Sequence, residues 1–207
     1  MSILTLSGSP SVQSRSAHLL AHLRGELEAA GERTSHIDLR ALPAGPLLAA
    51  RADDPAIAAA ARAIAEAQVV VLATPVYKAA YSGLLKAFLD LLPQTGLRDK
   101  VVLPIATGGS LAHALAIDYA LRPVLSALGS RHILPGIFAV DQQIEIDGSG
   151  PARFDAALAL RLEEGVLRVR EALARSRIDV PLEFVPVPLA QRAAHAAHAA
   201  VAQRCPA

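Results

Sequence analysis

The sequence has one cysteine, no tryptophan and only 3% aromatic residues among its 207 residues. The lone thiol, Cys205, cannot form an internal disulfide or build a zinc site, which favours a reducing compartment. No apolar run approaches the length of about 18 residues that a membrane span needs. The N-terminus also lacks the basic start and the long apolar segment of a signal peptide. We therefore expect a cytoplasmic protein without a membrane partner.

The net charge is also close to zero. The formal net charge is +1, and no basic stripe with interleaved aromatic residues is visible, so no nucleic-acid partner is expected. Residues 1–175 have the composition of one α/β domain. Residues 176–207 differ, because a proline-rich stretch is followed by an alanine and histidine tract, and we interpret them as a C-terminal tail.

Within the domain, strand-like segments alternate with helix-like segments. The expected strands are 3–6, 34–39, 69–73, 101–106 and 133–140, and the expected helices are 16–30, 55–67, 83–92, 110–128 and 152–175, with 41–54 irregular. Val69–Ala73 is continuously apolar, which is typical of a parallel strand buried on both faces. The alternation predicts an α/β fold, a doubly wound five-stranded parallel sheet with helices on both faces.

The first loop, Ser7–Ser16, joins a buried strand to a helix. Free N–H groups at a helix N-terminus favour an anion. The loop lacks the endings of triphosphate and dinucleotide loops, so a terminal monophosphate suits it better. The alternative is that a serine only caps the helix. The candidate anion ligands are Ser9, Ser14, Arg15 and Ser16.

Two further loops follow the third and fourth expected strands, at the sheet edge where ligands bind in such folds. In the first, a proline ends the strand, and Tyr77 could line a planar ring; ordinary packing of Tyr77 and Tyr81 is the alternative. In the second, paired glycines permit close approach to a flat ligand or merely a tight turn. The candidate binding residues here are Pro75, Val76, Tyr77, Lys78, Thr107, Gly108, Gly109 and Ser110.

The expected helix 110–128 does not keep one phase. Its apolar face begins with Leu111 and Leu115, is interrupted at Asp118 and Tyr119, and resumes shifted by about one residue. Pro123 lacks an N–H and would leave a helix carbonyl unpaired. A π-type bulge near residues 118–119 explains both features, whereas the residue pattern alone favours a simple proline kink.

The sequence shows no clear motif for a metal site or for acid–base catalysis. His18 and His22 stand four residues apart on an expected helix, but no third ligand is evident, so no metal site is expected. No Ser–His–Asp arrangement or catalytic carboxylate pair is apparent. We therefore identify no catalytic side chain, a pattern that suits chemistry carried out by a cofactor.

The residues of three runs resemble the NADPH-dependent FMN reductases, in particular the reductase components of bacterial two-component alkanesulfonate monooxygenases. The runs are Ala73–Gly83, Lys100–Gly109 and Asp118–Leu121, and the resemblance covers about residues 2–175. It implies a flavodoxin-like fold, with the FMN phosphate on the first loop and the isoalloxazine on the other two. Many relatives have Glu-Tyr-Asn where this chain has Val76-Tyr77-Lys78, which favours contacts from backbone amides there.

The resemblance further implies hydride transfer from NADPH, or from NADH, to FMN, and supply of reduced flavin to a partner monooxygenase. It places an inserted tyrosine, here Tyr119, in a π-bulge at a tetramer interface next to the flavin, so a homo-oligomer (dimer or tetramer) is expected. Two alternatives stay open, a flavodoxin-like electron carrier and an FMN-containing quinone or azo reductase. The low aromatic content and the charge of +1 disfavour the carrier.

Overall fold

The computed structural model describes residues 2–147 and 152–177. Its strands are β1 (Ile3–Ser7), β2 (Thr34–Asp38), β3 (Val69–Tyr77), β4 (Ala80–Tyr81), β5 (Val101–Gly108), β6 (His132–Ile133), β7 (Ile137–Val140), β8 (Ile144–Glu145) and β9 (Arg153–Phe154). Its helices are α1 (Arg15–Ala29), α2 (Ala44–Leu48), α3 (Pro55–Glu66), α4 (Gly83–Leu89), α5 (Arg122–Ala127) and α6 (Ala156–Arg177). Shorter turns are η1 (Leu39–Ala41), η2 (Leu111–His113), η3 (Ile117–Leu121) and η4 (Asp141–Gln143). The expected tail lies outside the described residues from residue 178 onward.

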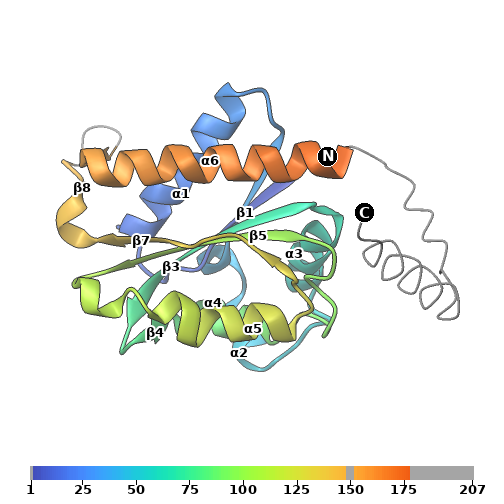
Figure 1. Cartoon of the computed structure of the whole chain (residues 1–207). Helices are drawn as coiled ribbons and strands as arrows, with labels where there is room; N and C mark the ends of the chain where they lie inside the picture. Colours follow the sequence, from blue (N-terminus) through green and yellow to red (C-terminus); the bar gives the residue numbers. More distant parts are fainter. Residues whose placement is uncertain (1, 148–151, 178–207) are drawn as a thin grey trace, which may run out of the picture. The chain divides into compact units, whose positions relative to one another are not determined.

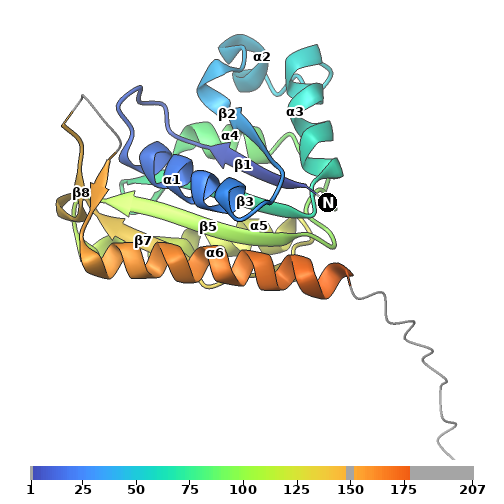
Figure 2. The same cartoon turned by 90° about the horizontal axis from the view of Figure 1, so that it is seen from above.

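The predicted parallel sheet is confirmed. Its strand order is β2-β1-β3-β5-β6, with β7 continuing beside β5, and all of these pairs are parallel. The order reverses beside β1, so the loops after β1 and β3 diverge to opposite sides of the sheet edge. Helices α1 and α6 cover one face of the sheet, and α4 and α5 lie on the other (Figure 1). Figure 2 shows α2 and α3 near the β2 edge.

Each sheet face has its own apolar core, which explains the continuous apolar strands. In β3, Val69 and Val71 face the α1 and α6 side, whereas Val70 and Leu72 face α3 and α4. All four side chains are at most 1% exposed. Because both faces of β3 are buried, residues 69–72 are apolar on both sets of alternating positions. The core therefore holds the C-terminal ends of β1, β3 and β5 at one edge.

The fifth expected strand, 133–140, is divided in two. β6 and β7 are separated at Leu134–Gly136, where Pro135 has no N–H for the ladder. A Cβ at Gly136 would lie 2.7 Å from Cγ2 of Ile117, so the chain passes close against η3 here. The prediction of one continuous strand was wrong because this tertiary contact requires a break.

Three further predictions needed correction. The hairpin partner β4, antiparallel to β3, was not expected, and it arises because Val76 and Tyr77 pair with Tyr81 and Ala80. Helix 152–175 begins only at Ala156, because Arg153–Phe154 pairs with β8 instead. Asp155 accepts a 2.7 Å hydrogen bond from the Leu158 N–H and caps this helix. The segment taken as irregular, 41–54, contains the short helix α2.

The expected helix 110–128 is broken, and its irregular centre is the π-helical turn η3. The Arg122 N–H donates to the carbonyl of Ile117, five residues back. Pro123 follows directly, in the first turn of α5, where a missing N–H costs least. The π-bulge is therefore confirmed over the simple proline kink, and Tyr119 lies within it with 79% of its surface exposed.

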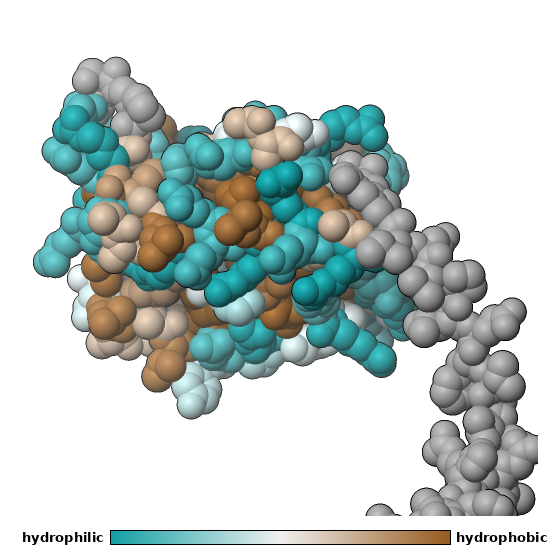
Figure 3. All heavy atoms as spheres, turned by 45° about the horizontal axis from the view of Figure 1, so that its top comes forward, coloured by the Kyte–Doolittle hydropathy of each residue, from teal (hydrophilic) through white to brown (hydrophobic). Residues whose placement is uncertain are grey.

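The outer surface carries few large apolar groups on the α6 side. Leu160 and Leu167 are 57% and 55% exposed, and Figure 3 shows hydrophobic side chains scattered between hydrophilic ones on this face. Single exposed leucines of this kind are common on protein surfaces. Within residues 2–147 and 152–177, no helix combines the length and hydropathy that crossing a bilayer requires.

Candidate functional site

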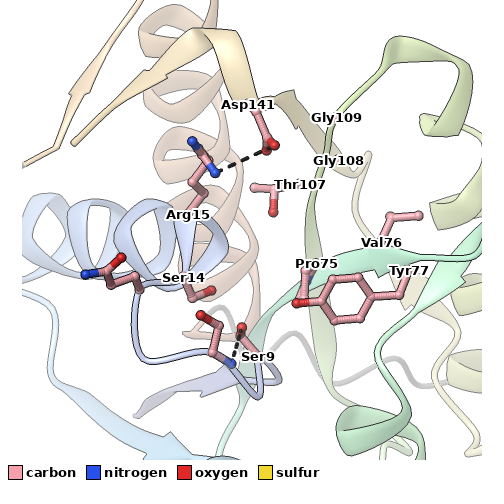
Figure 4. Close-up of a pocket in the computed structure, with 12 residues that line it drawn as sticks. Ser9, Ser14, Arg15, Pro75, Val76, Tyr77, Thr107, Gly108, Gly109 and Asp141 are labelled. Atoms are coloured by element: carbon pink, nitrogen blue, oxygen red, sulfur yellow. Dashed lines mark hydrogen bonds and ion pairs between the residues drawn. The ribbon is translucent and has the colours of Figure 1, made fainter.

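A cavity of about 280 Å³ opens at the C-terminal edge of the sheet, between the loops that follow β1, β3, β5 and β7 (Figure 4). It is lined by Ser9, Ser11, Gln13, Ser14, Arg15, Pro75, Val76, Tyr77, Thr107, Gly108, Gly109 and Asp141. Nine of the twelve predicted binding residues are among them; Ser16, Lys78 and Ser110 are not. Residues far apart in the sequence thus meet in one hollow, as the parallel topology requires.

The first loop holds its serines through a local network. Ser9 Oγ accepts a 3.2 Å bond from the Ser11 N–H. Ser14 is the N-cap of α1, since its Oγ accepts from the Ala17 N–H at 3.2 Å, and it lies 2.9 Å from Ser16 Oγ. The capping alternative is therefore correct for Ser14, which nevertheless also lines the cavity. Ser16 is fully buried and supports Ser14 from behind.

Arg15 begins α1 and carries a positive charge beside the free N–H groups of that helix. Its Nη1 lies 3.6 Å from Oδ2 of Asp141, and both side chains are nearly half exposed (Figure 4). Asp141 starts η4, directly after β7. Sequence reasoning missed Asp141, although its place after a parallel strand is the same signal that identified the other loops. Ser11 and Gln13 were also missed within the first loop.

The second loop is clamped at its base. Thr74 Oγ1 accepts a 3.0 Å bond from the Ser82 N–H, which closes the hairpin formed by β3 and β4. Lys78 occupies its tip with a φ of 50°, in the left-handed region, and lies outside the cavity lining. Tyr77 is 50% exposed at the cavity, whereas Tyr81 packs against the core and burial raises the pKa of its phenol. The packing alternative is thus correct for Tyr81 but not for Tyr77.

The third loop presents backbone rather than side chains. Thr107 is 3% exposed, and a Cβ at Gly108 would lie 3.1 Å from Cζ of Phe138. A side chain at Gly108 would therefore press on the ring of Phe138, and glycine keeps the cavity wall thin here. Gly109 borders open space, with Oδ2 of Asp141 4.0 Å from the position of an added Cβ. Ser110 caps η2 by accepting from the Ala112 N–H at 3.2 Å.

The chemistry of this lining fits FMN. One end offers a cation, hydroxyl groups and the N-terminus of a 15-residue helix, which together favour a phosphate. The other end offers two backbone segments, 75–77 and 107–109, beside which a flat ring can lie. The ionisable groups in the lining are Arg15, Tyr77 and Asp141, so it holds no nucleophile paired with a base.

The histidine pair of α1 has a structural explanation. The ring of His22 lies 4.9 Å from that of Phe154, tilted by 59°, so it packs under β9. His18 lines a different hollow beside β2. In the ranges that the structure covers, no three metal-binding side chains come together.

Comparison with known proteins identifies the family of this chain. Residues 1–145 match the family model of the NADPH-dependent FMN reductases. The chain is 46% identical to "FMN reductase (NADPH)" of Escherichia coli K12 over 181 residues, covering 87% of this chain and 94% of that protein. It is 47% identical to the protein of the same name from Pseudomonas putida KT2440 over 176 residues, covering 84% and 89%.

Solved structures show the same fold. The apo form of an NADH:FMN oxidoreductase, EMOB, superposes with a TM-score of 0.75 at 38% identity, covering 83% of this chain and 89% of that one. A Streptococcus pneumoniae flavodoxin superposes with a TM-score of 0.57 at 13% identity, covering 82% and 97%, which shows the flavodoxin-like fold alone. The sequence match over most of the chain shows more than the fold: this chain belongs to the NADPH-dependent FMN reductase family.

Proposed function

We propose that this chain is an NAD(P)H-dependent FMN reductase and that the three-loop cavity holds the flavin. The observation that carries the proposal is the single hollow in which an anion-binding helix end meets two backbone segments suited to a flat ring. The phosphate lies at Ser9, Ser14 and Arg15, with Ser16 supporting Ser14. The isoalloxazine lies along residues 75–77 and 107–109.

The reaction needs little from side chains. Bound FMN supplies a ring that accepts a hydride from the nicotinamide. The chain binds the phosphate, orients the ring and leaves one side of the site open, since Tyr77 is half exposed there. That open side would leave room for a nicotinamide to stack on the flavin, and hydride transfer between the two rings would need no general base from the chain.

The direct test is steady-state oxidation of NADPH and NADH with and without added FMN. We expect oxidation to depend on free FMN and the purified protein to be colourless, because the flavin is a substrate that leaves. A yellow protein that reduces quinones or azo dyes without added FMN would favour the alternative reductase. Redox cycling without NAD(P)H turnover would favour the electron carrier. Some relatives are named as NADPH-dependent and others as NADH-dependent. Comparing kcat/KM for NADPH with kcat/KM for NADH determines which nucleotide this chain prefers.

We propose further that reduced FMN is delivered in the cytoplasm to a flavin-dependent monooxygenase, with an alkanesulfonate as the final substrate. Support comes from the resemblance of the loop and helix runs to alkanesulfonate-system reductases. Sulfite release by such a monooxygenase, driven by this chain and NADPH, tests the pairing. No sulfite despite rapid FMN reduction would contradict it.

We propose that the segment bearing η2 and η3 forms a homo-oligomer interface. Leu111, Leu115 and Tyr119 are 71%, 59% and 79% exposed along this segment, an unusual series for apolar side chains. Deleting Tyr119 should restore a regular helix, change the oligomer and make the protein retain flavin. Light scattering and the flavin absorbance of the purified variant measure both effects. A colourless deletion variant of unchanged mass would show that Tyr119 only packs.

We also propose that residues 1–175 contain the whole reductase domain and that 176–207 are dispensable for FMN reduction. Within residues 2–147 and 152–177, the last residue that lines the cavity is Asp141. A folded protein truncated after residue 177 should keep its FMN-dependent NADPH oxidation, and loss of that activity would contradict the assignment.

A further inference from the structure

Asp141 and Arg15 face each other across one end of the cavity (Figure 4). Their closest charged atoms, Oδ2 and Nη1, are 3.6 Å apart, which is an ion pair but too long for a hydrogen bond. The pair therefore attracts Arg15 toward Asp141 while leaving the guanidinium N–H donors available to a second anion. Among the described residues, Arg15 is the cation that Asp141 contacts.

Asp141 does not depend on a ligand for its position. It follows β7, and the next turn is tied to α6 through Gln143. The side-chain carbonyl of Gln143 accepts from the Val140 N–H at 3.2 Å and from Arg161 Nη2 at 3.0 Å. Its amide donates to Asp155 at 2.9 Å. These bonds hold the backbone on both sides of Asp141, so the carboxylate stays beside Arg15 at little further entropic cost.

We propose that Asp141 is a specificity-determining residue that limits how strongly the phosphate contributes to flavin binding. This inference rests on the proposed function, in which the FMN phosphate meets Arg15. Two anions then share one cation: the phosphate gains only part of the attraction of Arg15, and it approaches a carboxylate of like charge. Riboflavin has no phosphate, so neither the sharing of Arg15 nor this repulsion acts on it.

This arrangement suits a reductase whose flavin is a substrate. A phosphate held by an unshared arginine at a helix N-terminus gains charge-assisted hydrogen bonds that slow its departure. Sharing Arg15 keeps recognition of the phosphate but reduces its strength. Asp141 thereby favours release of FMN over its retention.

The test compares the dissociation constants of FMN and riboflavin in the wild type, Asp141→Asn, Arg15→Ala and the double variant, by fluorescence quenching of the flavin. We expect Asp141→Asn to bind FMN about two- to fivefold more tightly, the range of one exposed ion pair, with riboflavin unchanged. In the Arg15→Ala background, the gain in FMN affinity from Asp141→Asn should be smaller, because only the direct repulsion between the carboxylate and the phosphate remains. The gain should also shrink as salt is added.

Asp53→Asn is the matched control. It also removes one carboxylate from an exposed ion pair, 3.0 Å from Arg51, but Asp53 does not line the cavity. It should leave both affinities unchanged. An equal gain in this control would mean that net charge, not Arg15, governs binding, and would overturn the inference.

The remaining outcomes separate this inference from the proposed function. If Arg15→Ala weakens FMN but Asp141→Asn changes nothing or weakens FMN, the role of Asp141 is overturned and the phosphate site stands. If the gain of Asp141→Asn is just as large without Arg15, the sharing of the arginine is overturned. If Arg15→Ala leaves the ratio of FMN to riboflavin affinity unchanged, the phosphate site itself is wrong and the role of Asp141 falls with it.

Discussion

Gly8, directly after β1, is the residue through which the first loop packs on the rest of the domain. Its N–H donates to the Ala73 carbonyl at 2.8 Å. A Cβ at Gly8 would lie 2.9 Å from Cβ of Leu85 and 3.2 Å from the Ala73 carbonyl oxygen. Leu85 is fully buried in α4, so neither contact can be relieved by moving a flexible side-chain end. We expect Gly8→Ala to lower the free energy of unfolding by about 1–3 kcal/mol, the usual cost of overpacking.

Gly25 offers the same substitution with the opposite result. It lies inside α1, and an added Cβ there meets no atom within 4 Å. Gly25→Ala should raise the free energy of unfolding by about 0.5–1 kcal/mol, because alanine is the better helix former. Urea denaturation followed by circular dichroism measures both variants. If Gly8→Ala proves as stable as Gly25→Ala, the close packing of the first loop against α4 is refuted.

Two further substitutions test the supports of the site. Ser82 is 1% exposed, donates to the Gly8 carbonyl and caps α4 through the Leu85 N–H at 3.1 Å. Ser82→Ala should therefore cost about 1–3 kcal/mol in urea denaturation, and an unchanged midpoint would refute the role. The Gln143 amide, and then the Leu158 N–H, lower the pKa of Asp155. Its carboxylate thus stabilises the fold fully above the unfolded-state pKa of about 3.9 and loses that effect as pH falls through the lower folded value. The deficit of Asp155→Ala in urea should be smaller at about pH 3 than at pH 7, and equal deficits would contradict this.

The main elements of the fold follow from local patterns in the sequence. The apolar run of β3 predicted a strand buried on both faces, and the phase slip around Tyr119 pointed to η3, although the resemblance was needed to prefer a π-bulge over a kink. Patterns of this kind depend only on residues close together in the sequence, so they can be recognised without knowledge of the packing. What they leave out is contact between distant segments. The division between β6 and β7 has a local cause in Pro135, which the sequence does display. The approach of Gly136 to Ile117 also contributes, and no periodicity in either segment reveals that contact.

The same distinction between local patterns and distant contacts applies to the site. Loop composition after each parallel strand identified most of the cavity lining, because the topology brings those strand ends together. Ser16 was expected to bind but lies behind Ser14, since a helix turn sends neighbouring side chains in different directions. Asp141 was missed because only the loops after the first, third and fourth expected strands were considered as ligand loops. Only the structure brings Asp141, which follows the fifth expected strand, to Arg15.

Gly109 provides the most direct test of the three-loop cavity as the flavin site. It lines the cavity, and an added Cβ would point into open space, 4.0 Å from Oδ2 of Asp141. Gly109→Leu should therefore fill the cavity without disturbing the core. The measurement is FMN-dependent NADPH oxidation by this variant, with its urea midpoint as the check on folding. We predict a wild-type midpoint with oxidation reduced to the background rate, whereas a folded Gly109→Leu protein with wild-type kcat/KM for FMN would contradict the placement of the flavin.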